Sequence, residues 1–183
     1  GMTGPKTNFA NSILISGDAG TGTLSSADGN TGVGTGVFAA LTTGDNNVAV
    51  GLNSLAAHTT GNNNTAVGKD ALNDNTTAAN NVAVGYESLS KNTTGTSLTA
   101  IGQLSLAANT TADDNTAVGR LALYANTTGA SNTSVGFSAL CTNTTGAHNT
   151  AVGHSAMLDN TTASYNTAFG KQTLEHNVTG EGN

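Results

Sequence analysis

A glycine that recurs every 17 residues constrains the fold of this chain more than any other feature. Nine glycines in this phase each follow an aliphatic or aromatic residue: Gly34, Gly51, Gly68, Gly85, Gly102, Gly119, Gly136, Gly153 and Gly170. Gly17 extends the phase back by one more unit. Self-similarity at a short fixed period is the signature of a repeat architecture. We therefore expect about ten copies of one unit over residues 14–183, preceded by a non-repeat arm or cap over residues 1–13.

Other positions of the unit also keep one residue type, so the repeats align in columns. With the glycine as position 1, the unit reads Gly-x-x-Ala/Ser-Leu-x-x-Asn-Thr-Thr-Gly/Ala-x-x-Asn-Thr-Ala-Val. Asparagine dominates positions 8 and 14. Two apolar columns are the candidate core: Val50, Val67, Val84, Ile101, Val118, Val135 and Val152 at position 17, and Leu55, Leu72, Leu89, Leu106, Leu123 and Leu140 at position 5.

Composition excludes a conventional globular core and several functional classes. Thr, Asn and Gly supply 80 of the 183 residues, and only 9% are charged, against roughly 25% in ordinary domains. The five basic residues are scattered, so nucleic-acid binding is not expected. No apolar run approaches the roughly 18 residues of a membrane span, so this segment is not expected to insert into a membrane. A single cysteine, Cys141, excludes internal disulfides.

The unit predicts one coil of an all-β parallel β-solenoid, or β-roll. Asn-Thr-Ala-Val is typical of a short strand that places Thr and Val on one face and Ala on the other. The glycine after it permits a bend, Ala/Ser-Leu is expected to form a second short strand, and Asn-Thr-Thr-Gly a second corner. Coils stacked about 4.8 Å apart would give a rod of roughly 48 Å, in which aligned asparagines form hydrogen-bonded ladders.

The apolar columns also predict association. Ala and Ser suit a narrow coil interior, so we expect the Val and Leu columns to face both that interior and an axis between chains. A full-length apolar stripe on a monomer would be a large exposed patch, and copies of the same rod would cover it. The expected partner is therefore the chain itself, as a homotrimer.

The step Asn64-Thr65-Ala66-Val67-Gly68 resembles the head repeat of trimeric autotransporter adhesins of the YadA-like kind. The longer unit, as in residues 118–129, resembles repeats in phage tail-fibre-like proteins. The resemblance covers residues 14–183 and implies a left-handed coil, trimerisation, and attachment to host or surface ligands. It places the chain on a bacterial cell surface or in a virion tail fibre, as a fragment of a longer fibre. The adhesin repeat is shorter, near fourteen residues, so the cross-section is expected to differ.

The chemistry-bearing residues give no catalytic or metal-binding pattern. Asp113 and Asp114 fall in a variable corner, and the four histidines occupy four different positions of the unit. No cofactor, metal or catalytic residue is therefore expected, and the chain is not expected to be an enzyme. Two pairs one coil apart, Asp74 with Lys91 and Asp159 with His176, are expected to form stacked ion pairs.

Positions 2, 3, 6, 7, 12 and 13 vary and carry nearly all charges and tyrosines. A constant frame with variable outward positions is suited to display a binding surface for a cell-surface glycan or protein. Two alternatives are a passive fibre spacer and an ice-binding solenoid, which needs a flat Thr-x-Thr array. The adjacent Thr pair at positions 9 and 10 should face different ways. The surface candidates for ligand contacts are Tyr86, Arg120, Tyr124, Phe137 and Tyr165.

Overall fold

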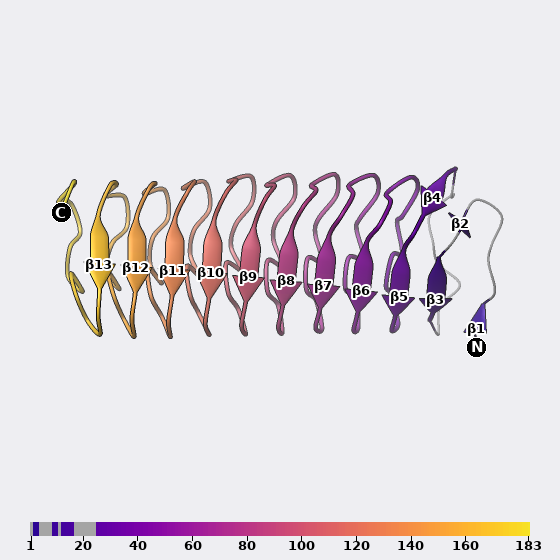
Figure 1. Cartoon of the computed structure of the whole chain (residues 1–183), viewed down its shortest axis with the longest axis horizontal. Coiled ribbons are helices and arrows are strands. Elements are labelled where there is room, and N and C mark those ends of the chain that lie inside the picture. Colours follow the sequence, from indigo (N-terminus) through magenta and orange to yellow (C-terminus); the bar gives the residue numbers. More distant parts are fainter. Residues whose placement is uncertain (1, 4–8, 11, 17–24) are drawn as a thin grey trace.

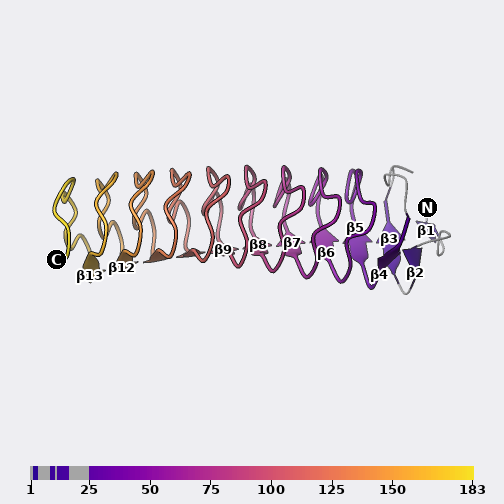
Figure 2. The same cartoon turned by 90° about the horizontal axis from the view of Figure 1, so that it is seen from above.

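The computed structural model describes residues 2, 3, 9, 10, 12–16 and 25–183, and it shows a straight stack of coils (Figures 1 and 2). Each coil contributes one strand to an eleven-stranded sheet along the side of the stack. The predicted all-β parallel β-solenoid is confirmed. Gly17 lies outside the described residues. The strands of the regular coils are β5 (Thr31–Val33), β6 (Val48–Val50), β7 (Thr65–Val67), β8 (Val82–Val84), β9 (Thr99–Ile101), β10 (Thr116–Val118), β11 (Thr133–Val135), β12 (Thr150–Val152) and β13 (Thr167–Phe169).

Neighbouring strands pair in parallel with a register of one unit. Thr116 of β10 aligns with Thr99 of β9 and with Thr133 of β11, so equal positions lie directly beside one another. At the N-terminal end, β3 (Ile13–Ile15) pairs in parallel with β5, 18 residues ahead. Three short strands complete the arrangement: β1 (Met2–Thr3), antiparallel to β3, and β2 (Phe9–Ala10), parallel to β4 (Ala27–Asp28).

The interior of the stack is filled by position 5 and position 16. The position 5 residues from Phe38 to Met157 are fully buried, like the central alanines of β6–β10 and β12, whereas Leu174 in the last coil is half-buried. The two columns pack closely: a Cβ added to Gly32, at position 16, would lie 3.0 Å from the ring of Phe38, at position 5. Because the bulky column already fills the coil, only Gly, Ala or Ser fits opposite it.

Position 17 is the main correction to the sequence-based expectation. The Leu column faces the coil interior as predicted, but the Val column does not, since the strand alternates with a period of two and Ala takes the inner face. The side chains at positions 15 and 17 instead point outward from β5–β13, and Ile101 is 41% exposed. We call these outward side chains the outer sheet face. Its position 17 residues are Val33, Val50, Val67, Val84, Ile101, Val118, Val135, Val152 and Phe169.

The expected second strand is absent from the regular coils. The position 5 residues all have positive φ, such as 51° for Leu106, which turns the chain instead of extending it. Positions 3 and 13 are also left-handed, as at Leu104 and Asp114. These turns still pair between coils, because Leu106 N donates to Ala122 O at 3.0 Å. Each coil is therefore one strand and a series of tight turns.

Substitutions at Leu106 test this left-handed backbone. A left-handed conformation costs an L-residue roughly 1–2 kcal/mol, and glycine avoids that cost. Leu106→Ala is expected to lower the free energy of unfolding by about 3 kcal/mol through lost burial. Leu106→Gly should be no less stable than Leu106→Ala, as measured by urea denaturation followed by circular dichroism. Ala122→Gly is the control: this buried residue lacks a positive φ, so glycine should cost about 1 kcal/mol there. If glycine lowered the free energy of unfolding relative to alanine by the same amount at both positions, position 106 would not be strained.

Candidate functional site

The five residues predicted from the sequence to contact a ligand are all exposed, but they lie on three different parts of the coil. Tyr86, Arg120 and Phe137 occupy position 2, two residues after a strand. Tyr124 occupies position 6 on the opposite side from the sheet, and Tyr165 occupies position 13, before β13. The structure therefore brings three of them into one column and separates the other two.

The position 2 column forms a ridge of cations and aromatic rings. The Arg120 guanidinium lies 5.4 Å from the centroid of the Phe137 ring, and that ring stacks on His154 at 5.1 Å. One further pair places the Lys69 ammonium 5.4 Å from the centroid of Tyr86. A hydrogen bond to Glu87 raises the pKa of the Tyr86 hydroxyl. Cation–aromatic contacts of this length are weakly favourable at exposed sites, so each one adds only a little stability to the ridge.

A shallow groove lies on the turns that follow position 2, and positions 3, 6 and 7 of successive coils line it. One open depression of about 270 Å³ is lined by Asp70, Asn73, Glu87, Ser90 and Lys91. The next depression shares the last three of these residues and adds apolar walls from Leu104, Ala107, Ala108 and Tyr124. The groove therefore has a polar half and an apolar half. Of these residues only Tyr124 is among the candidates predicted from the sequence, because the others come together only when positions 3, 6 and 7 of successive coils are stacked.

Lys91 is held at the groove wall by an ion pair with Asp74, which confirms the pair expected from the 17-residue spacing. The Lys91 ammonium lies 3.0 Å from Asp74, and this hydrogen bond raises the pKa of Lys91. Both side chains are exposed, so the pair adds little stability.

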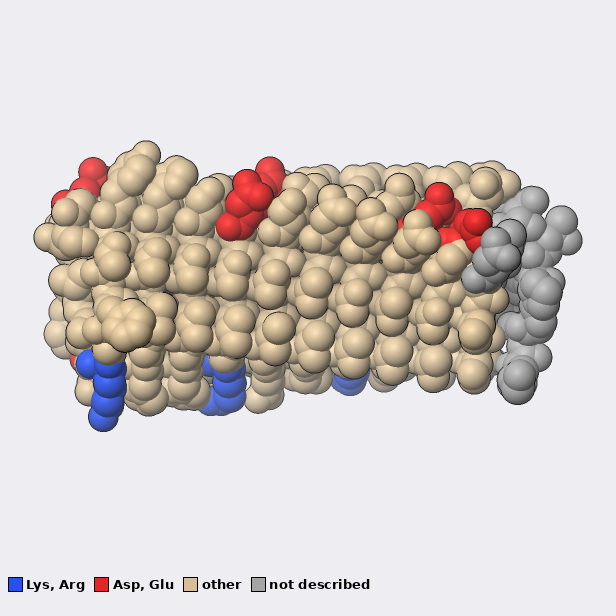
Figure 3. Space-filling view, in the orientation of Figure 1, with Lys and Arg blue, Asp and Glu red and all other residues tan. Residues whose placement is uncertain are grey.

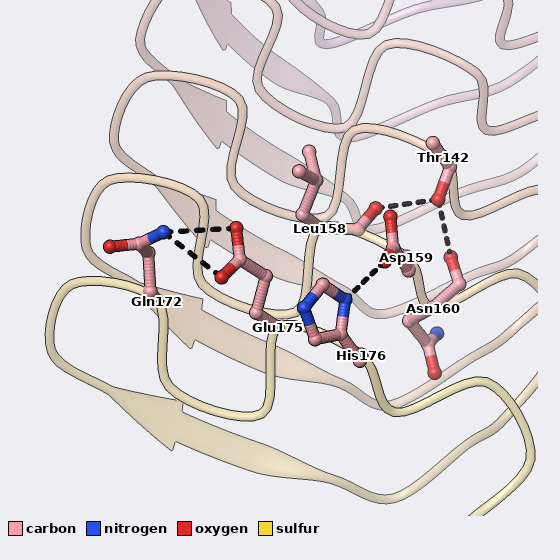
Figure 4. A network of polar contacts seen from close by, with 7 residues as sticks. All are labelled: Thr142, Leu158, Asp159, Asn160, Gln172, Glu175 and His176. Carbon is pink, nitrogen blue, oxygen red and sulfur yellow. Dashed lines mark hydrogen bonds and ion pairs between the residues drawn. The ribbon is translucent and has the colours of Figure 1, made fainter.

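The second predicted ion pair lies near the C-terminal end of the described coils (Figure 4). The His176 Nδ1 is 2.6 Å from Asp159 Oδ2, and this contact raises the pKa of His176. On the same turns, the Gln172 side-chain amide donates to both carboxylate oxygens of Glu175. Thr142 Oγ1 donates to the carbonyl of Leu158 at 2.5 Å. These contacts join neighbouring coils or brace one turn, which is a structural role.

Tyr165 makes a separate aromatic contact at position 13. Its ring stacks on His148 with a centroid distance of 4.9 Å and an interplanar angle of 11°. The two residues are one unit apart, and both have the left-handed backbone of this position. Tyr165 is 64% exposed, so it is available to a ligand, but no groove residue lies with it.

His58 is the one buried histidine among the described residues. It replaces asparagine in the position 8 column and is fully buried. Its Nε2 lies 2.7 Å from the Gly61 carbonyl, which can only accept, so Nε2 carries the proton. Its Nδ1 accepts from the Asn75 side-chain amide at 2.9 Å. Burial lowers the pKa of His58, because a second proton would place a charge in a site without water.

This arrangement predicts a stability that depends on pH. As pH falls below the ordinary value of 6.5, the unfolded chain binds a proton that the folded chain excludes. The free energy of unfolding should then fall by at most about 1.4 kcal/mol per pH unit. His58→Asn, which restores the residue typical of this column, should remove that component. Urea denaturation at pH 7 and pH 5 measures it, and an equal decline in both proteins would contradict the assignment to His58.

The remaining reactive groups of the described residues show no activated chemistry. Cys141 is half-buried, and burial raises the pKa of its thiol, which disfavours the thiolate. The described residues contain no group of three His, Cys, Asp or Glu side chains placed to hold a metal ion. Within the same residues, no helix has the length and apolar character needed to cross a membrane.

No protein-family model, no curated protein and no solved structure matches this chain.

Proposed function

We propose that this chain is a non-catalytic segment of a surface fibre, either a bacterial adhesin head or a phage tail fibre. It acts as a rigid rod that assembles as a homotrimer and displays its variable turns outward. The proposal rests on the composition of the outer sheet face. None of its side chains on the nine strands β5–β13 is charged: they are Thr, Val, Ile and Phe. An uncharged and largely apolar strip along the stack of coils is a typical surface for association.

The resemblance to adhesin-head and tail-fibre repeats supports the same assignment, and the turns opposite the sheet supply a place for attachment. In the proposed trimer the sheet faces turn inward and the groove lined by Glu87, Lys91 and Tyr124 stays accessible. A groove with one polar and one apolar wall suits a ligand that is itself amphipathic, such as a cell-surface glycan. If the segment is only a spacer, the groove binds nothing and a further domain supplies the contact. A glycan array probed with the wild-type chain and with Tyr124→Ala separates these two roles.

The oligomeric state tests the proposal. Light scattering after size exclusion should give the mass of three chains, where one chain has a mass of 17.9 kDa. Val84→Lys with Val118→Lys places two cations on the outer sheet face and should give monomers with an unchanged circular dichroism spectrum. Thr77→Lys with Thr111→Lys, on the exposed position 10 column, is the matched control and should remain trimeric. A monomeric wild-type chain would overturn the trimer.

Ice binding is a second candidate, and one observation favours it. The adjacent threonines at positions 9 and 10 differ in exposure as expected, but seven of the nine regular strands begin with an outward Thr two residues before the outward Val, Ile or Phe. This face is a regular Thr-x-Val array, and β-branched side chains hold fixed rotamers. A trimer would cover it, so the two functions exclude each other. A monomer that shows thermal hysteresis, lost in Val84→Lys with Val118→Lys, would establish ice binding instead.

A further inference from the structure

The outer sheet face has oppositely charged edges (Figure 3). One edge carries Asp45, Asp113 and Asp114, which lie two or three residues before a strand. We call this the acidic edge, and Glu181 extends it beyond β13. The other edge carries Lys69, Arg120 and Lys171, each two residues after a strand. We call this the basic edge.

Most of these edge charges have no ion-pair partner within the described residues. Of the three basic-edge residues, only Lys69 forms a salt bridge, at 3.4 Å to Asp70. The Arg120 Nε donates to the neutral side chain of Gln103 at 3.2 Å. On the acidic edge, Asp113 accepts hydrogen bonds from Thr96, which leaves its negative charge uncompensated. By contrast, Lys91 on the back of the rod is paired with Asp74 at 3.0 Å.

From these edges we propose that copies of this chain pack in parallel and in register, with the basic edge of one copy against the acidic edge of the next. The inference rests on the proposed function, which supplies the association itself. A symmetry axis parallel to the rod brings each basic edge to an acidic edge. An axis perpendicular to the rod would reverse one copy and place acidic edge against acidic edge. Like charges brought together at an interface are strongly unfavourable.

The spacing along the rod fixes the register. Arg120 and the pair Asp113 and Asp114 flank the same strand, β10, so in register they lie at the same height. Lys171 follows β13, and Glu181 belongs to the next coil. Lys69 follows β7, while Asp45 precedes β6. Each base of one copy therefore meets an acid of its neighbour at the same coil or one coil away.

The charges at β10 test the arrangement by reversal and rescue. Arg120→Glu should raise the concentration at which the trimer half-dissociates at least about tenfold in low salt, as measured by analytical ultracentrifugation. The double variant Asp113→Lys with Asp114→Lys should do the same. Combining all three changes restores opposite charges across the interface and should return dissociation close to that of the wild type. Thr77→Glu with Thr111→Glu, which changes the net charge by the same amount on the exposed position 10 column, is the control and should leave the trimer intact.

A disulfide test reports the direction of the chains. In a Cys141→Ser background, Arg120→Cys with Asp113→Cys should oxidise to a covalently closed trimer on a denaturing gel, because each chain links to both neighbours. The single variants Arg120→Cys and Asp113→Cys in the same background should not cross-link, because parallel packing keeps like edges apart. A cross-linked dimer of either single variant would mean antiparallel packing and would overturn the inference. Trimers that are indifferent to all charge reversals would overturn it as well, while leaving the proposed fibre role standing. A wild-type monomer would overturn the proposed function and this inference together.

Discussion

Replacing Gly119 by Ala is expected to lower the free energy of unfolding by about 4 kcal/mol, through strain and overpacking at one corner. Gly119 has φ of 131°, a conformation that side chains rarely adopt. A Cβ at this position would also lie 2.5 Å from the carbonyl oxygen of Gly136 in the next coil. Neither residue can move away easily, because Gly119 N donates to Ile101 O and Gly136 N donates to Val118 O. Urea denaturation followed by circular dichroism measures the loss.

The matched control is Gly129→Ala at position 11. An added Cβ there also approaches a backbone oxygen, at 2.2 Å, but Gly129 lacks a positive φ, and the same column already contains Ala78, Ala112 and Ala163. The fold therefore accommodates a methyl group at this corner, and the loss should be about 1 kcal/mol. Equal losses at Gly119 and Gly129 would mean that crowding alone, and not the backbone conformation, makes position 1 glycine.

The corners at positions 1 and 11 illustrate which features follow from the 17-residue period. The 17-residue spacing predicts which residues stack, because a solenoid places equal positions of successive coils side by side. The parallel register, the asparagine ladders and the ion pair of Lys91 with Asp74 all follow from that spacing. Position 11 holds either Gly or Ala, whereas position 1 holds only Gly. This difference distinguishes a corner that is only crowded from a corner whose φ disfavours any side chain.

The period could not predict which apolar column faces inward. Val118 and Leu123 are both aliphatic, and both of their columns are apolar in every regular coil. The choice depends on the turn at position 5, where Leu123 adopts a φ of 52° that no propensity for leucine predicts. That turn directs Leu123 into the coil and leaves room only for Ala117 on the facing strand. For the same reason, the groove beside Tyr124 could not be assembled from one unit, since its walls come from successive coils and depend on the turn geometry.

Replacing Asn109 by Asp should destabilise the rod by about 3–5 kcal/mol at pH 7, because it leaves an uncompensated charge inside. Asn109 is fully buried in the position 8 ladder. Its Nδ2 donates to Asn92 Oδ1 at 2.9 Å and to the Ala112 carbonyl at 3.1 Å. Its own Oδ1 accepts from Asn126 at 3.2 Å. Aspartate keeps the shape but sets an acceptor against two acceptors, so no cavity contributes to the loss.

The pH dependence of this variant distinguishes the ladder from general polarity. A buried carboxyl among acceptors should have a raised pKa, so the folded variant holds its proton at pH values where the unfolded chain has lost it. Stability relative to the wild type should therefore recover as pH falls toward about 4, where the protonated carboxyl can donate to Asn92 again. Asn80→Asp is the control: Asn80 is exposed at position 13, which already carries Asp114, and its loss should stay within about 0.5 kcal/mol at every pH. Each hydrogen bond of the ladder joins two coils. If the free energy of unfolding lost in Asn109→Asp were the same at every pH, the side-chain amide would not help to hold successive coils together.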